Sequence, residues 1–256
     1  MSQIVLTLRR ALTHPLEAGC VVPDRFATLS QREISVLPVW SAGEPRTRRE
    51  LGEVFSIAGE RAAAVRVQGD AALVEHLGRG MAGGRLEIEG NAGSGAGLEM
   101  KGGTLVVHGS AGTHLGGAQP GASRGMTGGE ILVHGSAGFE TGARMRRGMI
   151  FVGGNVGELA GRGMIAGTLV VGGALGADPG AFLKRGSLVA LGAVPIPLTY
   201  RYACTYRPPH LRFILSRLRA LYRAPITEAQ ITGSYRRFIG DLAGLGKGEL
   251  LAWTTA

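Results

Sequence analysis

Two histidines stand at positions where their side chains could share a metal ion. His108 and His134 each follow a short apolar run and precede a glycine, in segments so alike that the two rings should stack on one another. Imidazole is a common zinc ligand, but a zinc site needs three or four ligands. The matching positions of neighbouring segments hold Glu89, Gly153, Gly172 and Leu191. No third ligand is evident, so the pattern favours an exposed ladder of side chains, and we expect this chain to bind no metal.

Six basic residues form a second group that could bind a ligand. The same repeated segments should bring them to one side of the molecule, as a strip of Arg144, Arg146, Arg147, Arg162, Lys184 and Arg185. Such a strip could hold a polyanionic chain loosely, through contacts worth about 0–1 kcal/mol each when exposed. A solvated surface, or an interface with an acidic protein, explains the same residues and is the simpler interpretation.

The sequence contains no complete motif for catalysis or nucleotide binding. Gly93–Gly97 has part of the glycine spacing of a dinucleotide-binding loop, but no helix follows it. Gly244–Lys247 resembles a phosphate-binding loop, yet Gly248 stands where Ser or Thr is required. No nucleophile, base and orienting group come together. We therefore expect the chain not to be catalytic by itself; a stand-alone enzyme would have to depend on the two histidines.

A repeat of 19 residues must position these side chains. Its copies begin at Met81, Met100, Met126, Met145, Met164 and Leu183. Successive copies begin 19 residues apart, except that the third begins 26 residues after the second. The seven extra residues of this interval lie around 115–124. Of the 44 glycines, 33 lie between residues 79 and 192. A fixed period of this length indicates a solenoid, in which each unit is stable only when stacked on its neighbours.

Each copy contains one strand bounded by glycines. Apolar residues alternate in it, as at Leu86 and Ile88 or Ile150 and Val152, and β-branched residues dominate. A weaker copy occupies residues 65–69, and no helix of useful length fits between the strands. We predict an all-β fold, a right-handed parallel β-helix of about six or seven coils stacked roughly 4.8 Å apart. The methionine column and the alternating aliphatic residues should fill its interior.

The flanking segments differ in composition from the repeats. We predict an N-terminal cap segment (1–59), the Gly-rich β-helix (60–200) and a basic C-terminal segment (201–256). The first contains strand-like runs at 4–8 and 54–57 and a short helix within 24–37. In the last, a helix should begin at the paired prolines 208–209, because apolar residues then recur at helical spacing from 211 to 222. We expect this helix to cap the last open coil and protect its strand edge; a partner-docking helix with a basic face is the alternative.

Charge and composition exclude several classes of protein. Of the net charge of +9, residues 201–256 supply +6, from nine basic and three acidic side chains. The chain lacks a nucleic-acid-binding motif and is only 5% aromatic, so an acidic protein or a polyanionic substrate is the favoured partner over nucleic acid. Two cysteines form no disulfide framework. No stretch is apolar enough for a signal peptide or a membrane span, so we expect a soluble cytoplasmic protein.

The run Gly-Met-x-Gly-Gly-x-Leu/Ile-x-Val-x-Gly-x-Ala-Gly resembles a Gly-rich β-helix found in two families. One is the C-terminal domain of the glutamate synthase large subunit, and the other is the C-type subunit of formylmethanofuran dehydrogenase. The segments Pro23–Ala27, Leu37–Trp40 and Tyr235–Leu251 resemble the flanks of this C-type subunit. The resemblance to it thus extends over nearly the whole chain. A glutamate synthase-like module remains the alternative of another class.

The resemblance implies a scaffold subunit of a one-carbon complex, of the kind used in methylotrophy. In the formyltransferase/hydrolase version, an amidohydrolase-like subunit with a metal site, its paralogous subunit and a formyltransferase subunit pass formyl from tetrahydromethanopterin to methanofuran and release formate. In the dehydrogenase version, other subunits carry molybdenum or tungsten and iron–sulfur clusters. Only two lysines, Lys101 and Lys184, precede Lys247, whereas Arg and Ala abound. This bias is typical of G+C-rich bacterial genomes, so we favour the hydrolytic complex.

The resemblance also gives the basic strip a candidate ligand. Methanofurans carry glutamate-containing tails, and a bound formyl carrier must reach separate active sites. We therefore expect that this chain binds no cofactor alone and that the metals lie on partner subunits. Contact between the strip and the polyglutamyl tail of the carrier within the complex is the functional alternative to a solvated surface or an interface with an acidic subunit.

Overall fold

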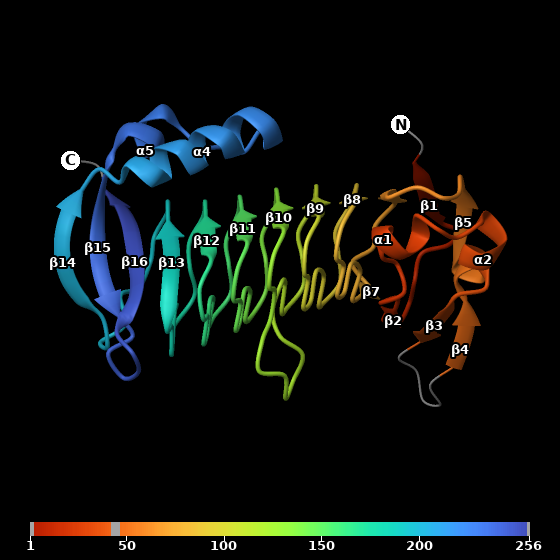
Figure 1. Ribbon diagram of the computed structural model, residues 1–256, viewed down its shortest axis with the longest axis horizontal. Coiled ribbons are helices and arrows are strands. Elements are labelled where there is room, and N and C mark those ends of the chain that lie inside the picture. The colour runs from red at the N-terminus through yellow and green to blue at the C-terminus, as the bar shows by residue number, and fades with distance from the viewer. Residues whose placement is uncertain (1–2, 42–46, 255–256) are drawn as a thin grey trace.

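The computed structural model describes residues 3–41 and 47–254, and most of its regular structure is β. The strands are β1 (Ile4–Leu8), β2 (Leu16–Glu17), β3 (Pro38–Ser41), β4 (Thr47–Glu50), β5 (Phe55–Ala58), β6 (Ala64–Gln68), β7 (Val74–Glu75), β8 (Arg85–Ile88), β9 (Thr104–Val107), β10 (Glu130–Val133), β11 (Met149–Val152), β12 (Thr168–Val171), β13 (Arg185–Ala190), β14 (Arg201–Tyr206), β15 (Ser234–Gly240) and β16 (Lys247–Thr254). The helices are α1 (Pro23–Phe26), α2 (Gln31–Ser35), α3 (Leu51–Val54), α4 (Pro209–Tyr222) and α5 (Glu228–Thr232). Figure 1 shows the repeats as a row of similar turns between two differently built ends.

Twelve strands form one mixed sheet in the order β14-β15-β16-β13-β12-β11-β10-β9-β8-β6-β1-β5. Each repeat contributes one parallel strand in register with the next, so that Leu105 lies opposite both Leu86 and Ile131. A second parallel ladder of single bridges joins the same repeats from Ala71 to Leu175. The repeats that begin at Met81 to Met164 are therefore paired with one another along two lines, and the seven-residue insertion leaves that register intact.

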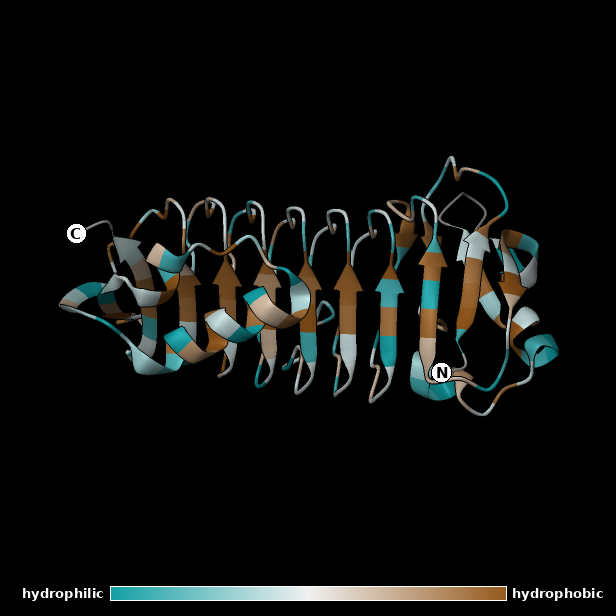
Figure 2. Cartoon of the chain, turned by 90° about the horizontal axis from the view of Figure 1, so that it is seen from above, coloured by the Kyte–Doolittle hydropathy of each residue, from teal (hydrophilic) through white to brown (hydrophobic). Residues whose placement is uncertain are grey.

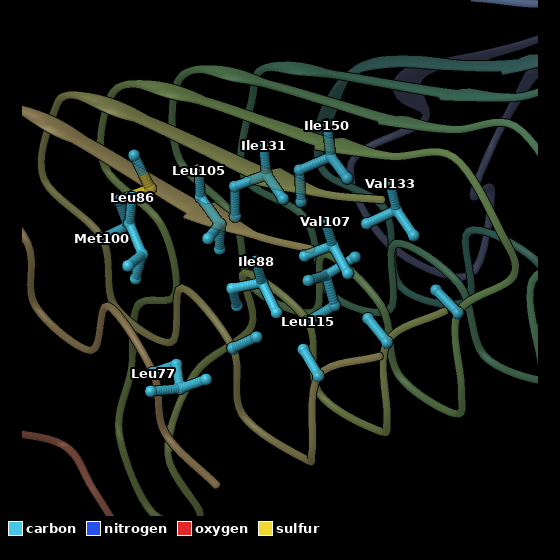
Figure 3. Close-up of a cluster of buried hydrophobic side chains, with 14 of the residues drawn as sticks. Leu77, Leu86, Ile88, Met100, Leu105, Val107, Leu115, Ile131, Val133 and Ile150 are labelled. Atoms are coloured by element: carbon cyan, nitrogen blue, oxygen red, sulfur yellow. The ribbon is translucent and has the colours of Figure 1, made fainter. Parts of the chain in front are cut away.

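The interior is filled by aligned columns of apolar side chains. The five methionines that begin the first five copies and the inward-facing residues of the strands are fully buried. Figure 3 shows Leu105, Ile131 and Ile150 side by side in this interior. The methionine and glycine columns depend on each other. A Cβ added to Gly148 would lie 2.7 Å from the Cε of Met126 in the preceding repeat. The glycine thus leaves room for the methionine, which confirms the predicted methionine column.

Additional strands extend both ends of the row of repeats. β1 pairs parallel to β6 and antiparallel to β5, and β16 pairs parallel to β13 before β15 and β14 add antiparallel. A second, four-stranded sheet has the order β4-β3-β2-β7. The strand edge that the C-terminal helix was expected to cover is therefore occupied by β16.

The predicted position of that helix is wrong. The buried face of α4, formed by Leu211, Leu215 and Leu218, packs on the outer face of the sheet rather than on its end. Seen from above, α4 crosses the apolar strands of the C-terminal repeats (Figure 2). The physical reason is a second apolar column, which faces outward from β9 to β13 and needs a cover: Val106, Leu132, Phe151, Val170 and Val189.

Other predicted elements agree more closely with the structure. The run 4–8 is β1, and the run 54–57 is β5 shifted by one residue. The single helix expected within 24–37 is two helices, because Ser30 begins a new one with a capping box to Glu33. No helix in the described part of the chain is long and apolar enough to cross a membrane. Parts of the predicted terminal segments, namely residues 1–2, 42–46 and 255–256, lie outside the described residues.

Candidate functional site

A hollow with a basic lining opens where three repeats turn a corner. It has a volume of about 330 Å³, and we call it the cationic hollow. Its lining residues are Ser123, Arg144, Arg162, Gly163, Ile165, Phe182 and Lys184. Three of the seven are cationic, and none of them is acidic.

The backbone of the repeat explains why the hollow exists. Arg144, Gly163 and Phe182 occupy the same corner in successive repeats, and all three are left-handed, with φ of 56°, 61° and 59°. The middle one has no side chain, so a gap opens between the other two. The Cγ of Arg144 lies only 3.4 Å from where a Cβ of Gly163 would be. The arginine side chain therefore extends across the glycine and forms a wall of the hollow.

The insertion between the second and third repeats supplies another wall. We call residues 117–125 the insertion loop. The guanidinium of Arg144 donates a hydrogen bond to the carbonyl oxygen of Ala122 in this loop. Ser123 from the same loop reaches the hollow itself. The loop thus orients the arginine and closes one side of the site.

The three cations differ in how their charge is balanced. Arg162 donates to Glu140, whose other carboxylate oxygen lies 3.4 Å from the Nδ1 of His114. In the described part of the chain, no carboxylate lies within ion-pair distance of Arg144 or Lys184. Two of the three cations therefore remain available to an anionic ligand.

The predicted strip divides into two groups in the structure. Arg144, Arg162 and Lys184 meet at the cationic hollow, whereas Arg146, Arg147 and Arg185 do not line it. Arg146 is half-buried at the turn before β11, and Arg185 begins β13 opposite Lys247. The contribution of the insertion loop was not predicted, although the irregular interval of 26 residues was its visible signal.

The stacked histidines are confirmed. The rings of His108 and His134 lie 5.2 Å apart between centroids, inclined by 20°. His108 Nε2 lies 2.8 Å from Oε1 of Glu87. Glu87 belongs to the preceding repeat, and its side chain lies on the same face of the sheet as that of His108. Glu87 was not among the predicted site residues, because it occupies a different column of the repeat from the histidines. Across residues 3–41 and 47–254, no three or more His, Cys, Asp or Glu side chains are placed to hold a metal.

Burial and neighbouring charges set the protonation of this group. Burial opposes ionisation of Glu87, but the hydrogen bond from His108 and the charges of Arg85 and Arg66 hold the pKa of its carboxyl below the usual value. Burial, together with the adjacent His108 ring, lowers the pKa of His134. The arrangement is a charged cluster on the outer face of the sheet, in which Glu87 is held ionised beside the stacked histidine rings.

Comparison with curated proteins finds a consistent set of relatives. No protein-family model matches the chain. It is 37% identical over 95 residues to the C-type subunit of molybdenum-containing formylmethanofuran dehydrogenase 1 of Methanosarcina barkeri, a match to 36% of this chain and 32% of the relative. It is 33% identical over 96 residues to the C-type subunit of tungsten-containing formylmethanofuran dehydrogenase 2 of Methanothermobacter wolfeii, a match to 36% and 34%. The match thus spans about a third of the length of these relatives.

A solved structure matches over a far greater length. It is a chain of the formyltransferase/hydrolase complex FhcABCD from Methylorubrum extorquens, a complex crystallised with methylofuran. The two chains are 34% identical, with a TM-score of 0.81, over 98% of this chain and 100% of the other. The whole architecture is therefore shared, including both ends.

Proposed function

The chain belongs to the family that includes the C-type subunits of formylmethanofuran dehydrogenases and the matching chain of the FhcABCD formyltransferase/hydrolase complex, and from this we propose that it is the structural subunit of a formyltransferase/hydrolase complex. That complex would transfer formyl from tetrahydromethanopterin to a methanofuran and release formate. Its catalytic work would lie on an amidohydrolase-like subunit, the paralogue of that subunit and a formyltransferase subunit.

The length over which the chain matches each relative favours the hydrolytic complex. The similarity to the FhcABCD chain extends from end to end at 34% identity, whereas similarity to the molybdenum and tungsten enzymes is limited to about a third of each relative. The dehydrogenase remains the second candidate, because the curated relatives carry that name. A glutamate synthase-like module is less well supported, since both ends match a chain of the formyl-transfer complex.

We further propose that residues 60–200 form a right-handed parallel β-helix between the N-terminal segment 1–59 and the basic C-terminal segment 201–256. The two parallel ladders and the buried methionine column support this fold. A scaffold of this kind suits a structural subunit, because the flanking strands extend the sheet at both ends of the row of repeats and α4 covers its outer face.

The cationic hollow is the proposed contact for the acidic tail of the formyl carrier. A polyglutamyl chain presents carboxylates at regular intervals, and Arg144 and Lys184 present charges without a carboxylate partner among the described residues. Each exposed contact would contribute about 0–1 kcal/mol, which suits a tail that must be held but must also move.

A matched pair of variants tests the hollow. Arg144→Ala with Lys184→Ala removes its unbalanced cations, and Arg147→Ala with Arg185→Ala removes two cations of the same predicted strip that lie outside it. In the intact complex, the first pair should weaken binding of the carrier about 3- to 30-fold and flatten its salt dependence. The second pair should do neither. Equal effects from both pairs would rule out a specific role for the hollow.

The function itself is tested by purifying the tagged chain from its native host. Mass spectrometry should identify an amidohydrolase-like subunit and a formyltransferase among the copurifying proteins, and elemental analysis should find neither molybdenum nor tungsten. Molybdenum or tungsten together with iron–sulfur subunits would instead assign the chain to a dehydrogenase.

A further inference from the structure

The last strand of the large sheet, β14, has an open edge. It pairs with β15 on one side, and no described strand pairs with its other side. Five of its six residues, from Arg201 to Thr205, are exposed, so neither of its faces is covered. At the opposite edge, β5 is shorter and keeps Phe55 buried. In Figure 1, β14 is the outermost strand at the C-terminal end of the molecule.

An open edge of this kind needs protection or a partner. Unpaired backbone N–H and C=O groups form a template for another strand, and proteins usually guard such edges with prolines or short strands. β14 contains no proline and is longer than any strand from β8 to β12. One irregularity in its pairing, between Tyr202 and Cys204, lies on the side that faces β15. The free side is therefore suited to accept an added strand.

Exposed apolar side chains lie on β14 and on the loops at one end of it. Tyr202 is 56% exposed, and its ring meets that of Phe238 edge-on at 5.9 Å. Leu198, Leu242 and Leu245 are exposed on the two adjacent loops, which are joined by a hydrogen bond from the Leu242 N–H to the carbonyl oxygen of Thr199. Exposed apolar groups gathered beside a free strand indicate an interaction surface.

The charge at this edge has one sign. Arg201 begins the strand, Arg207 follows it, and the guanidinium of Arg236 lies 5.1 Å from the ring centroid of Phe238. Within the described residues, none of these three has a carboxylate at ion-pair distance. The nearby carboxylates are engaged elsewhere, since Glu249 accepts from Arg237 and Asp241 accepts from backbone N–H groups. A second copy of the same edge would bring arginines against arginines, so an acidic partner fits better.

We propose that β14 is a docking edge for an extended, acidic segment of another subunit of the complex, which adds as a further strand beside it. The main-chain hydrogen bonds would supply affinity, and the arginines with Tyr202 would select acidic and apolar side chains. This inference rests on the proposed function, because it takes the partner from the same assembly.

The exposed Cys204 offers a direct measurement in the native complex. The other cysteine, Cys20, is removed as Cys20→Ser, and alkylation of Cys204 by N-ethylmaleimide is compared between the isolated chain and the complex. We expect alkylation in the complex to be slower by about tenfold or more, because the side chains of the docked segment would cover the thiol. Equal rates in the two states would overturn the proposal.

Charge reversal provides the second measurement. Arg201→Glu with Arg236→Glu should release partner subunits at lower salt than the unchanged chain does, with no loss of thermal stability in the isolated chain. Arg212→Glu with Arg223→Glu makes the same change of net charge on and just beyond α4 and should have no such effect. Equal release by both pairs would overturn the docking edge. So would light scattering that showed a dimer of the unchanged isolated chain and a monomer of the Arg201→Glu, Arg236→Glu variant, because β14 would then join two copies of this chain. If the unchanged chain captured no subunits at all, the proposed function would fail and this inference with it.

Discussion

Glu130 and Arg217 lie 87 residues apart in the chain and form a two-pronged ion pair. The guanidinium donates through Nη1 at 2.5 Å and through Nη2 at 3.0 Å to the two carboxylate oxygens. The hydroxyl of Tyr222 adds a third hydrogen bond at 2.7 Å. Because Glu130 begins β10 and the other two residues lie on α4, this contact fixes the far end of the helix over the repeats.

Replacing Glu130 with Gln should lower the free energy of unfolding by about 1 kcal/mol. Hydrogen bonds to charged groups contribute about 1.5–3 kcal/mol, and partial exposure of the pair reduces this. Urea denaturation at pH 7 measures the change. Glu228→Gln is the control, since that carboxylate pairs with Arg219 in a more exposed position and should matter by less than about 0.5 kcal/mol.

The same variant has a predicted pH dependence. Burial opposes ionisation of Glu130, but the hydrogen bonds from Arg217 and Tyr222 hold the pKa of its carboxyl below the usual value. Its contribution is therefore complete above the unfolded pKa of about 4.3 and is lost as the pH falls through the folded pKa. The stability difference between the two proteins should shrink in acid. A difference that stayed constant would mean that the ion pair contributes nothing to it.

The strands were predictable because the repeat multiplies a weak signal. One alternating run such as Leu105–Val107 is ambiguous, but the same run in register through six copies is not. The helix α4 was predicted from its own spacing, whereas its location was not. The helix lies where it does because the outward-facing residues are apolar from Val106 to Val189. The equivalent outward position in the preceding repeat is Glu87, so the apolar outer face begins at Val106. Only an alignment of the outward positions of all copies shows this boundary.

The candidate site was predicted only in part for a similar reason. The repeat identified Arg144 and Lys184 as neighbours on one side. The hollow between them depends on Gly163, whose missing side chain opens the space, and on the carbonyl of Ala122, which orients the arginine. The conformation of a loop outside the repeat cannot be derived from the period, so this wall of the site was not foreseen.

His134 should make the protein less stable in mild acid. Burial lowers the pKa of its imidazole, so the unfolded chain takes up the proton more readily than the folded one. The contribution of the neutral ring is complete above the unfolded pKa of about 6.5 and is lost as the pH falls through the folded value. Between pH 7.5 and 5.5, the free energy of unfolding should fall more steeply for the unchanged protein than for His134→Asn. Parallel curves would show that this histidine is not the titrating group.

The two cysteines should react at very different rates. Burial raises the pKa of the Cys20 thiol to about 11, which leaves roughly one thiolate in a thousand at pH 8. Cys204 is exposed on β14. Iodoacetamide at pH 8 should therefore label Cys204 of the isolated chain almost completely before Cys20, as measured by peptide mass spectrometry. Comparable labelling of both would mean that the segment around Cys20 opens readily.

Four Gly→Ala variants separate the two demands that the repeat makes on its glycines. Gly148 has a φ of 97° and also has the carbonyl oxygen of Gly129 only 2.6 Å from where its Cβ would be. Gly80 has a φ of 66°, but a Cβ there would meet open space. At Gly102 φ is not positive, but a Cβ would crowd the carbonyl oxygen of Ala82. Gly83 has neither a positive φ nor a crowded Cβ position. We expect no loss of stability at Gly83, about 1 kcal/mol at Gly80 from backbone strain, and about 1–3 kcal/mol at Gly102 from steric overlap.

Gly148→Ala should combine both penalties and lower the free energy of unfolding by about 2–4 kcal/mol. Thermal and urea denaturation of the four variants measure the two terms separately, and Gly83→Ala controls for the effect of an added methyl group on the unfolded chain. A loss at Gly80 as large as that at Gly148 would show that backbone conformation alone selects glycine at the corners. A small loss at Gly148 would show that the neighbouring repeat can shift, and the dependence of the glycine column on the methionine column would then be wrong.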